Sequence, residues 1–338
     1  MDPESVDGAG RVPHGSSDDP DVLDFSANIN SRVPDGAHDA YAAALDESRS
    51  YPPDDYPDYR AAAADYVGCA PEAVVPTAGG LAAIRLAVAV TLEAGDSALV
   101  PSPSFGEYAR EVELQGGEPA FVPHDELLDA DPEPHSLAVV CNPNNPTGEA
   151  YDADALRAFA ARCRAADTVL LADEAFLGFT AEPSLAGVPG VVVARSLTKL
   201  FGYPGLRAGF AVAEGEPLDR LATARRAWSL GWPAARVGTV SMRDEAFVAS
   251  TRERVARERA YLREGLATRF DVGDSDAPFL LVDVGESPDA LLERAREQGV
   301  VVRDATTFRG LNSHVRVAVK ERTANDRLLD ALGVDVPV

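Results

Sequence analysis

The sequence predicts an α/β fold with a mostly parallel central sheet and a smaller α+β domain. From residue 74 to residue 215, short apolar runs rich in β-branched residues alternate with segments of helical periodicity. Strands that are apolar throughout and alternate with helices belong to a parallel sheet covered on both faces. The chain has 338 residues, 46% of them hydrophobic, which is enough for one large domain and one smaller one.

The central sheet is predicted to contain strands separated by helices. The expected strands are the apolar runs 98–100, 120–122, 137–141, 169–172, 191–194 and 209–212. The helices expected around them are 59–66, 81–92, 106–114 and 154–165. Because such sheets bind ligands at the carboxyl ends of their strands, the residues that follow these strands are candidates for a site.

After residue 215 the composition shifts to arginine-rich helix. A long helix that links two domains is predicted by apolar residues along one helical face: Val255, Leu262, Leu266 and Phe270. A small α+β domain is predicted from strands 279–284, 300–303 and 315–319 and from helices 288–298 and one ending at 332. The predicted organisation is an N-terminal arm with part of the small domain (1–36), a large domain (37–215), and the linking helix with the small domain (216–338).

Composition and charge exclude several classes of protein. The formal charge of −24 argues against a nucleic-acid binder, which needs a basic face. No apolar run approaches the ~20 residues of a membrane span, and no export signal opens the chain, so we expect a soluble protein. Cys69, Cys141 and Cys163 lack metal-ligand spacing, which predicts no metal site and fits a reducing cytoplasm. The acid excess, with only two lysines, indicates a halophilic protein adapted to high salt.

The segment 195–207, RSLTKLFGYPGLR, contains Lys199, which together with Lys320 makes up the lysines among 31 Lys and Arg residues. Imine formation needs an amine and cannot use a guanidinium, because an amine can lose its proton and attack a carbonyl. The hydroxyls of Ser196 and Thr198 and the guanidinium of Arg207 indicate a phosphate nearby. Together these groups predict pyridoxal phosphate as the cofactor. The alternative is a solvated loop lysine.

Polar groups follow two further predicted strands. The segment 142–148, NPNNPTG, follows one strand, and 173–176, DEAF, ends the next. The turn 77–80 precedes a helix and has two glycines whose free amides suit a phosphate, although such turns also begin ordinary helices. Three strand ends with unusual polar groups would be a coincidence among structural loops, so a site is predicted there.

In this order the motifs resemble the fold-type I pyridoxal-phosphate enzymes, and within them the branch of histidinol-phosphate aminotransferase and threonine-phosphate decarboxylase. The resemblance runs from His14 to Arg316 and so covers nearly the whole chain. It implies the fold-type I transferase fold and pyridoxal 5′-phosphate as the cofactor. It also implies a homodimer, in which Tyr51 reaches the site of the second subunit.

The resemblance implies a role for each cofactor residue. Lys199 would hold the cofactor covalently and later move a proton, and Asp173 would pair with the pyridine nitrogen. Tyr108 would stack on the ring, and Asn145 would bind the phenolic oxygen. The cofactor phosphate would be held by a set of amides, hydroxyls and one guanidinium: Gly79, Gly80, Ser196, Thr198, Arg207 and Tyr51 of the second subunit.

Substrate-binding residues are expected in the arm and the small domain. By the resemblance, Arg316 would form a bidentate pair with the substrate carboxylate. We expect His14, Asn30 and Arg303 to grip a phosphate on the substrate. The alternatives are that the arginines snorkel at a sheet edge and that the segment around His14 is a mobile tail.

Three departures from the family pattern bear on this site. Phe176 stands where aminotransferases of this branch usually have tyrosine and the decarboxylase-like relatives have phenylalanine. Leu81 replaces a residue that is commonly acidic or polar, so the phosphate would depend on backbone amides and the other partners. The usual His-Gly-Gly of the decarboxylase is His-Gly-Ser at 14–16.

The resemblance thus implies a lyase that decarboxylates O-phospho-L-threonine to (R)-1-amino-2-propanol O-phosphate, a step of cobalamin biosynthesis. The substrate class would be a small phosphorylated amino acid. One alternative is a histidinol-phosphate or other amino acid aminotransferase, because both reactions begin in the same way. A cofactor-binding regulatory protein without turnover is the third hypothesis.

Overall fold

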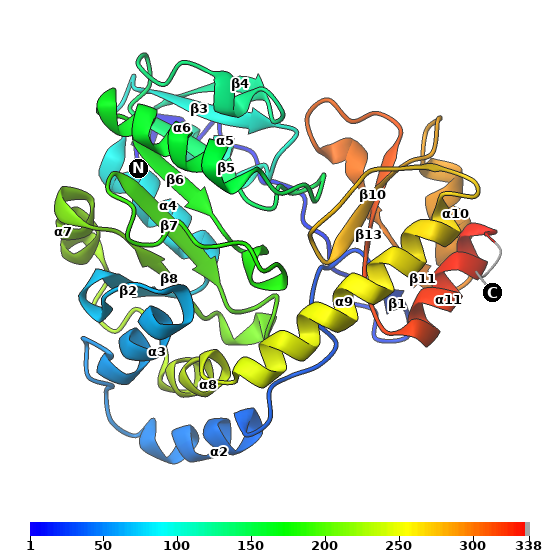
Figure 1. Ribbon diagram of the computed structural model, residues 1–338, viewed down its shortest axis with the longest axis horizontal. Helices are drawn as coiled ribbons and strands as arrows, with labels where there is room; N and C mark the ends of the chain where they lie inside the picture. Colours follow the sequence, from blue (N-terminus) through cyan, green and yellow to red (C-terminus); the bar gives the residue numbers. More distant parts are fainter. Residues whose placement is uncertain (335–338) are drawn as a thin grey trace.

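The computed structural model describes residues 1–334, so the last four residues of the predicted third segment, 335–338, lie outside the described part. The chain forms a large lobe and a smaller lobe. The long helix α9 (Glu245–Leu266) runs from one lobe to the other (Figure 1). The apolar spacing predicted a linking helix here, but Phe270, the last residue of the predicted apolar face, lies beyond the end of α9.

The large lobe is built on a seven-stranded sheet of order β2-β8-β7-β6-β5-β3-β4. Strands β3 to β7 pair in parallel, whereas β8 is antiparallel to both β7 and β2. The predicted α/β class with a mostly parallel sheet is therefore confirmed. The strands are β2 (Val74–Thr77), β3 (Ser97–Ser102), β4 (Glu118–Pro123), β5 (Leu137–Cys141), β6 (Val169–Asp173), β7 (Val191–Ser196) and β8 (Gly209–Val212).

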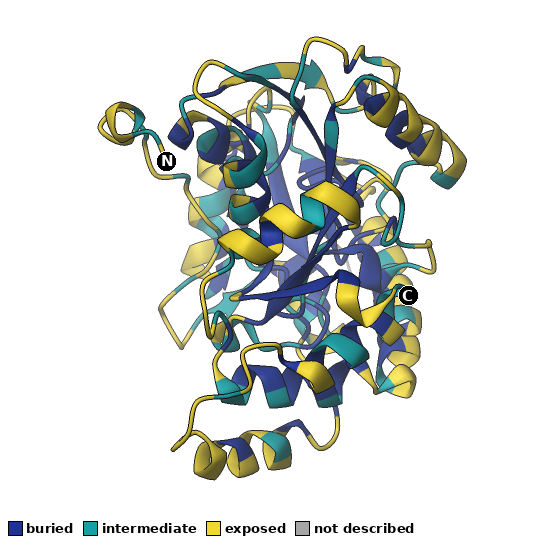
Figure 2. Ribbon diagram, turned by 90° about the vertical axis from the view of Figure 1, so that its left-hand side faces the viewer, coloured by how far each residue is buried: buried dark blue, intermediate teal, exposed yellow. Residues whose placement is uncertain are grey.

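Helices cover both faces of this sheet because its central strands are apolar on both faces. In β7, Val191 and Val193 face one core cluster, while Val192 and Ala194 face the other. The first cluster includes α3 (Pro57–Val67), α6 (Ala153–Ala165) and α8 (Trp232–Met242). The second includes α4 (Gly80–Thr91), α5 (Glu107–Leu114) and α7 (Gly215–Ala224). Figure 2 shows the buried sheet inside and the exposed outer faces of the helices.

The small lobe contains a four-stranded sheet of order β12-β13-β10-β9. Its strands are β9 (Asp271–Val272), β10 (Phe279–Asp283), β12 (Arg303–Asp304) and β13 (His314–Ala318), with helices α10 (Asp289–Glu297) and α11 (Arg322–Leu332) beside them. The single strand predicted at 300–303 is wrong. It is divided into β11 (Val300–Val301), which pairs with β1 (Leu23–Asp24) of the arm, and β12, which pairs with β13.

Several helices and strands were not predicted as separate elements. Helix α2 (Ala37–Glu47) buries only Ala37 and Ala44 and packs on α8, so its short alanine-rich sequence gives little periodic signal. The arm begins with the four-residue helix α1 (Pro3–Val6). The boundaries of the three predicted segments stay predictions.

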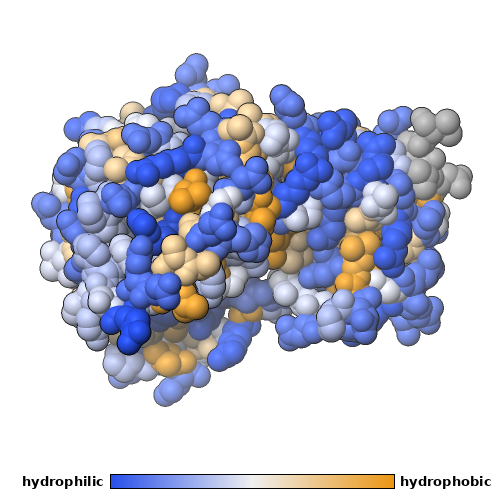
Figure 3. Space-filling model, turned by 90° about the horizontal axis from the view of Figure 1, so that it is seen from below, coloured by the Kyte–Doolittle hydropathy of each residue, from blue (hydrophilic) through white to orange (hydrophobic). Residues whose placement is uncertain are grey.

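Figure 3 shows a surface that is mostly hydrophilic on the side seen from below, with hydrophobic atoms in separate patches. Within residues 1–334, no helix combines the length and the apolar character needed to cross a membrane. In the same residues, no group of histidine, cysteine and acidic side chains is arranged to hold a metal ion.

Candidate active site

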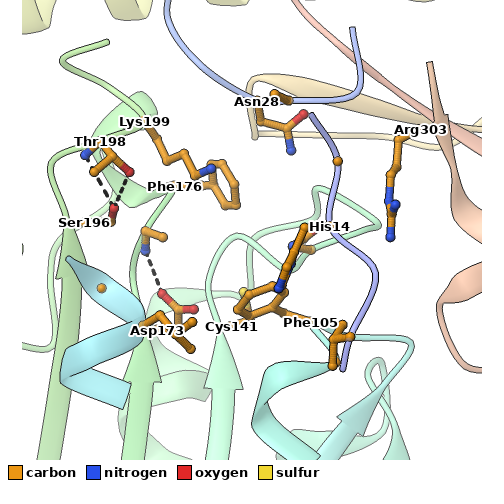
Figure 4. Close-up of a pocket in the computed structure, with 18 of the residues that line it drawn as sticks. His14, Asn28, Phe105, Cys141, Asp173, Phe176, Ser196, Thr198, Lys199 and Arg303 are labelled. Carbon is orange, nitrogen blue, oxygen red and sulfur yellow. Dashed lines mark hydrogen bonds between the residues drawn. The ribbon is translucent and has the colours of Figure 1, made fainter. Parts of the chain in front are cut away.

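A cavity of about 350 Å³ lies where the ends of β5, β6 and β7 face the small lobe. Its walls come from these strand ends, the first turn of α4, the arm, β12 and β13. Figure 4 shows two groups of side chains across this cavity. We call them the lysine side (Asp173, Ser196, Thr198 and Lys199) and the arginine side (His14, Asn28, Arg303 and Arg316).

Lys199 lies in the turn after β7, and its side chain enters the cavity. Burial, followed by the positive charges of Arg316 and Arg207, lowers the pKa of Lys199 to about 8, and the carboxylate of Asp173 opposes this change. An amine with this pKa is partly neutral near neutral pH, as attack on a carbonyl requires. These surroundings favour a reactive lysine over a solvated loop lysine.

Asp173 ends β6 and is 5% exposed. Its Oδ1 accepts the amide of Ala175 at 3.0 Å, and its Oδ2 accepts the hydroxyl of Tyr108 at 2.6 Å. Burial raises the pKa of Asp173, while these two hydrogen bonds and Lys199 act in the opposite direction. A buried carboxylate in a fixed orientation is suited to pair with a cationic ring nitrogen.

Tyr108 lines the cavity, but its hydroxyl is bound to Asp173, so its visible role is to orient that carboxylate. Its stacking on a ring stays a prediction. Phe105 is a second aromatic candidate that sequence reasoning missed. It borders the cavity and meets Tyr108 edge-on, with ring centroids 5.5 Å apart. The signal was its position in the turn after β3, because strand ends line the site.

The predicted phosphate site combines a helix N-terminus with the lysine turn. The first amides of α4 lack intrahelical partners, as at any helix start. A Cβ atom would lie 2.9 Å from Arg207 Nη2 if placed on Gly79, and 3.1 Å from Ser196 Cβ if placed on Gly80. The hydroxyls of Ser196 and Thr198 lie 2.8 Å apart. Amides, hydroxyls and a guanidinium around a space that only glycine leaves open fit a phosphate dianion.

The two arginines occupy directly opposite positions of the antiparallel strands β12 and β13. Arg316 is 6% exposed and donates to Asn145 Oδ1 and, at 2.9 Å, to the carbonyl of Ser26. Arg303 is 9% exposed and donates to the carbonyl of Pro13 at 2.7 Å. Among the described residues, neither guanidinium forms an ion pair with a carboxylate.

This concentration of positive charge is reflected in the pKa values. Burial and, secondarily, repulsion from Arg303 lower the pKa of Arg316 to about 9. Burial also lowers the pKa of Arg303, which Asp304 partly opposes. Buried charges are costly unless an opposite charge joins them. The pair is therefore suited to an anionic ligand rather than to snorkelling.

Asn145 connects the two sides of the cavity. Because its Oδ1 accepts from Arg316, its amide nitrogen is the group left to donate to a ring oxygen. The predicted contact to the phenolic oxygen is compatible with this orientation and stays a prediction.

The arm crosses the mouth of the cavity. His14 Nε2 lies 3.1 Å from Glu107 Oε1, and its ring centroid lies 5.8 Å from that of Phe105. A Cβ atom on Gly15 would collide with the carbonyl of Ser26 and come within 3.4 Å of Arg303. These contacts favour a lid over a mobile tail.

The structure does not bring Asn30 to the cavity, so its predicted contact with substrate is corrected. Its amide nitrogen donates to the carbonyl of Leu200 at 2.8 Å, and its Oδ1 accepts from Arg254 at 2.6 Å. Asn28, two residues earlier, lines the cavity, and its buried Oδ1 has no partner in the described part of the chain. Asn28 rather than Asn30 is therefore the asparagine of this segment that is placed to contact a ligand.

Tyr51 lies outside the cavity of its own subunit. It is 79% exposed and stacks on Trp228 with ring centroids 4.5 Å apart. A contact with the phosphate site of a second subunit therefore stays a prediction.

Phe176 lines the cavity and packs edge-on against Phe279, with centroids 5.0 Å apart. Its phenyl ring offers no hydroxyl to a bound cofactor or substrate. Leu81 also lines the cavity, so the start of α4 presents an apolar side chain beside its amides.

Comparison with known proteins agrees with this geometry. The family model of aminotransferase class I and II matches residues 20–332, and the chain belongs to this family. Histidinol-phosphate aminotransferase 2 of Archaeoglobus fulgidus is 30% identical over 325 residues, which cover 93% of each chain. A protein of Caldanaerobacter subterraneus named as a threonine-phosphate decarboxylase is 31% identical over 310 residues, covering 85% of this chain and 83% of the relative.

Among solved structures, histidinol-phosphate aminotransferase from Sinorhizobium meliloti in complex with pyridoxal-5′-phosphate superposes with a TM-score of 0.82. The sequence identity is 22%, and the match covers 90% of this chain and 88% of the other. The protein is thus an enzyme of the fold-type I pyridoxal-phosphate class, and pyridoxal phosphate is its cofactor. On the lysine side, Lys199, the buried carboxylate of Asp173 and the predicted phosphate site fit this group.

Proposed function

We propose that this enzyme decarboxylates O-phospho-L-threonine to (R)-1-amino-2-propanol O-phosphate. The observation that carries the proposal is the pair Arg303 and Arg316. Both line one cavity at opposite positions of neighbouring strands, and neither is paired with a carboxylate in residues 1–334. Two guanidiniums suit a substrate that carries two anionic groups.

The two candidate substrates differ in the number of anionic groups that they carry. Phosphothreonine carries a carboxylate and a phosphate on the same small molecule, so each arginine would have an anion to bind. Histidinol phosphate has a phosphate but no carboxylate, and the N–H group of its imidazole needs a hydrogen-bond acceptor. The arginine side thus fits a substrate with two anionic groups, which phosphothreonine has and histidinol phosphate lacks.

Pyridoxal phosphate, when bound, would accept the electron pair released from one bond of the substrate α-carbon. Which bond this is depends on how the protein holds the rest of the substrate. Arg303 and His14 would grip the phosphate and turn the molecule, while Arg316 would hold the carboxylate. Binding energy at a remote group can be used in this way for orientation. After carbon dioxide leaves, the α-carbon needs a proton, which Lys199 would supply.

Phe176 supports the same proposal, because the decarboxylase-like relatives have phenylalanine at this position. Sequence identity does not distinguish a decarboxylase from an aminotransferase, since the two relatives above, one of each kind by name, are 30% and 31% identical to this chain. The alternative, an aminotransferase acting on histidinol phosphate or another amino acid, is therefore part of the test.

The experiment is a product analysis with O-phospho-L-threonine and no keto-acid acceptor. We expect carbon dioxide and aminopropanol phosphate over many turnovers, and slow reaction with unphosphorylated threonine. A single half-turnover that leaves the cofactor in its amine form, restarted only by 2-oxoglutarate, would reject decarboxylation and support the aminotransferase alternative. Binding without any product would support a regulatory protein.

We further propose a homodimer, in which exposed apolar side chains such as Tyr41, Leu45 and Trp228 contribute to subunit contact. The product would supply the aminopropanol phosphate of the cobalamin nucleotide loop. We also propose that the protein is cytoplasmic and that it functions in high salt.

A further inference from the structure

Asn30 binds the backbone of the catalytic lysine segment at two successive residues. Its own amide donates to the carbonyl of Lys199 at 3.0 Å. Its side-chain Nδ2 donates to the carbonyl of Leu200 at 2.8 Å. Asn30 is 7% exposed, so both hydrogen bonds lie away from competing water.

The position of Gly202 also indicates a close contact between the arm and the lysine turn, independently of the Asn30 side chain. Gly202, three residues after Lys199, has a φ of 74°. A Cβ atom there would lie 2.6 Å from the carbonyl oxygen of Arg32 and 3.0 Å from that of Asn30. A residue other than glycine would therefore push the arm away from the lysine turn.

The other end of the Asn30 side chain is bound to α9. Its Oδ1 accepts from Arg254 Nη2 at 2.6 Å and from the amide of Arg32 at 3.1 Å. The Arg32 guanidinium in turn holds Glu321 with hydrogen bonds of 2.9 and 3.1 Å. Glu321 lies three residues beyond β13, the strand that carries Arg316. The lysine turn is thereby connected to the small lobe.

We propose that Asn30 is a positioning residue that fixes the main chain of Lys199 and thereby sets where its amine lies in the cavity. The lysine turn follows the end of β7 and precedes the short 3₁₀ turn Pro204–Leu206, so neither a strand nor a helix holds Lys199. Asn30 provides that restraint. The inference does not depend on the proposed decarboxylation, because transamination also needs Lys199.

The sizes of the two expected effects favour a change in the catalytic rate over a change in stability. The net contribution of one neutral hydrogen bond to stability is small, so a folded enzyme can lose it. A displacement of about 1 Å at a reacting group, in contrast, can lower the rate about a hundredfold. Loss of the Asn30 contact should therefore be seen in kcat before it is seen in folding.

The test variant is Asn30→Asp. Its carboxylate can still accept from Arg254 and Arg32, but it cannot donate to the carbonyl of Leu200. We expect kcat to fall at least about tenfold, with KM within about twofold of the original value. The matched control is Asn325→Ala, which removes another buried asparagine that binds Glu258 and Lys320 but does not contact the lysine turn. Its kcat per folded molecule should stay unchanged.

A readout other than activity uses the two lysines. In cofactor-free full-length protein, Asn30→Asp should raise the labelling rate of Lys199 by an amine reagent relative to Lys320, by at least about threefold, measured by mass spectrometry. If Asn30→Asp fails to fold, Gly202→Ala tests the same contact and should show the same two changes. The proposal is overturned if either kcat or the labelling ratio stays at the original value, or if Asn325→Ala lowers kcat equally.

Discussion

The two sides of the cavity differ in how the chain builds them. The lysine side comes from the ends of neighbouring parallel strands of one sheet, with Asp173 at the end of β6 and Lys199 in the turn three residues after β7. The arginine side joins the arm to the small lobe, where Arg303 and Pro13 are 290 positions apart in the sequence. One side is built on one sheet and the turn that follows it, whereas the other depends on two segments that must meet.

The charges differ as well. On the lysine side the Asp173 carboxylate faces the Lys199 amine, and each influences the pKa of the other. The arginine side carries two guanidiniums without a carboxylate partner in the described residues. We infer that the cofactor completes the first side and that the substrate completes the second. Variants on the two sides should therefore fail in different ways.

The largest effect is expected from Lys199→Ala, because in the proposed assignment Lys199 is the amine that would hold the cofactor and move the proton. Turnover should fall by at least about a thousandfold. Borohydride should fix the cofactor on Lys199 in the original protein, mapped by mass spectrometry. Lys320→Met is the control and should keep both activity and the label. Finding the label on Lys320 would contradict the assignment of the lysine side.

On the arginine side, Arg303→Ala should raise KM for phosphothreonine about 10- to 100-fold, because it removes a charge-assisted contact worth about 1.5–3 kcal/mol. Cofactor binding, followed by visible absorbance, should be unchanged. Arg309→Ala is the control for net charge, since Arg309 is exposed and stacks on Phe121. Equal losses with phosphothreonine and threonine would show that Arg303 does not read the phosphate.

The difference between the lysine side and the arginine side also explains which features could be predicted from the sequence. Local patterns predict the strands β3 to β8 of the central sheet, although not β2. They also predict the clustering of Asp173, Ser196 and Lys199, because parallel strands bring their carboxyl ends together. Asn28 and Asn30 differ by two positions in one irregular segment, and no periodicity there indicates which one faces the cavity. The orientation of Asn30 depends on Arg254 and Leu200, which lie far along the chain.

Other differences between the predicted and the observed secondary structure also depend on partners elsewhere in the fold. Strand 300–303 is divided because two different partners, β1 and β13, pair with its two halves, and a run of valines does not encode partner choice. Helices α2 and α8 stabilise each other by packing, so neither is recognisable from its own sequence.

The third prediction concerns Tyr51, which lies on neither side of its own cavity. If it completes the phosphate site of a second subunit, mixed Tyr51→Ala and Lys199→Ala dimers should regain about a quarter of the original activity, since half the dimers would have one intact site. The measurement needs verified subunit exchange and inactive parent variants. Absence of recovery under those conditions would place Tyr51 outside the site.

A smaller effect is expected from salt, because the net charge of −24 repels itself where screening is weak. The Debye length is about 10 Å at 0.1 M salt and about 3 Å at 1 M. The melting temperature should rise by several degrees between 0.05 and 0.5 M potassium chloride, and more slowly above that. A rise that is linear to high concentration would indicate solute exclusion instead of charge screening.

The smallest effect concerns the stability of the cofactor-free protein. The pKa of Lys199 is lowered from 10.5 to about 8, so between these pH values the unfolded chain binds a proton that the folded chain lacks. Stability should therefore rise with pH through this window, and the cost of the buried charge is fully present below pH 8.

Lys199→Met removes this cost and should stabilise the cofactor-free protein at pH 7 by on the order of 1–2 kcal/mol, after allowance for partial solvent screening. Urea unfolding at pH 7 and above pH 10.5 measures the difference between the variant and the original protein. This difference should shrink at the higher pH, where the lysine is neutral in both states. A constant difference would mean that methionine stabilises through packing, and that the lysine side does not hold Lys199 at an energetic cost.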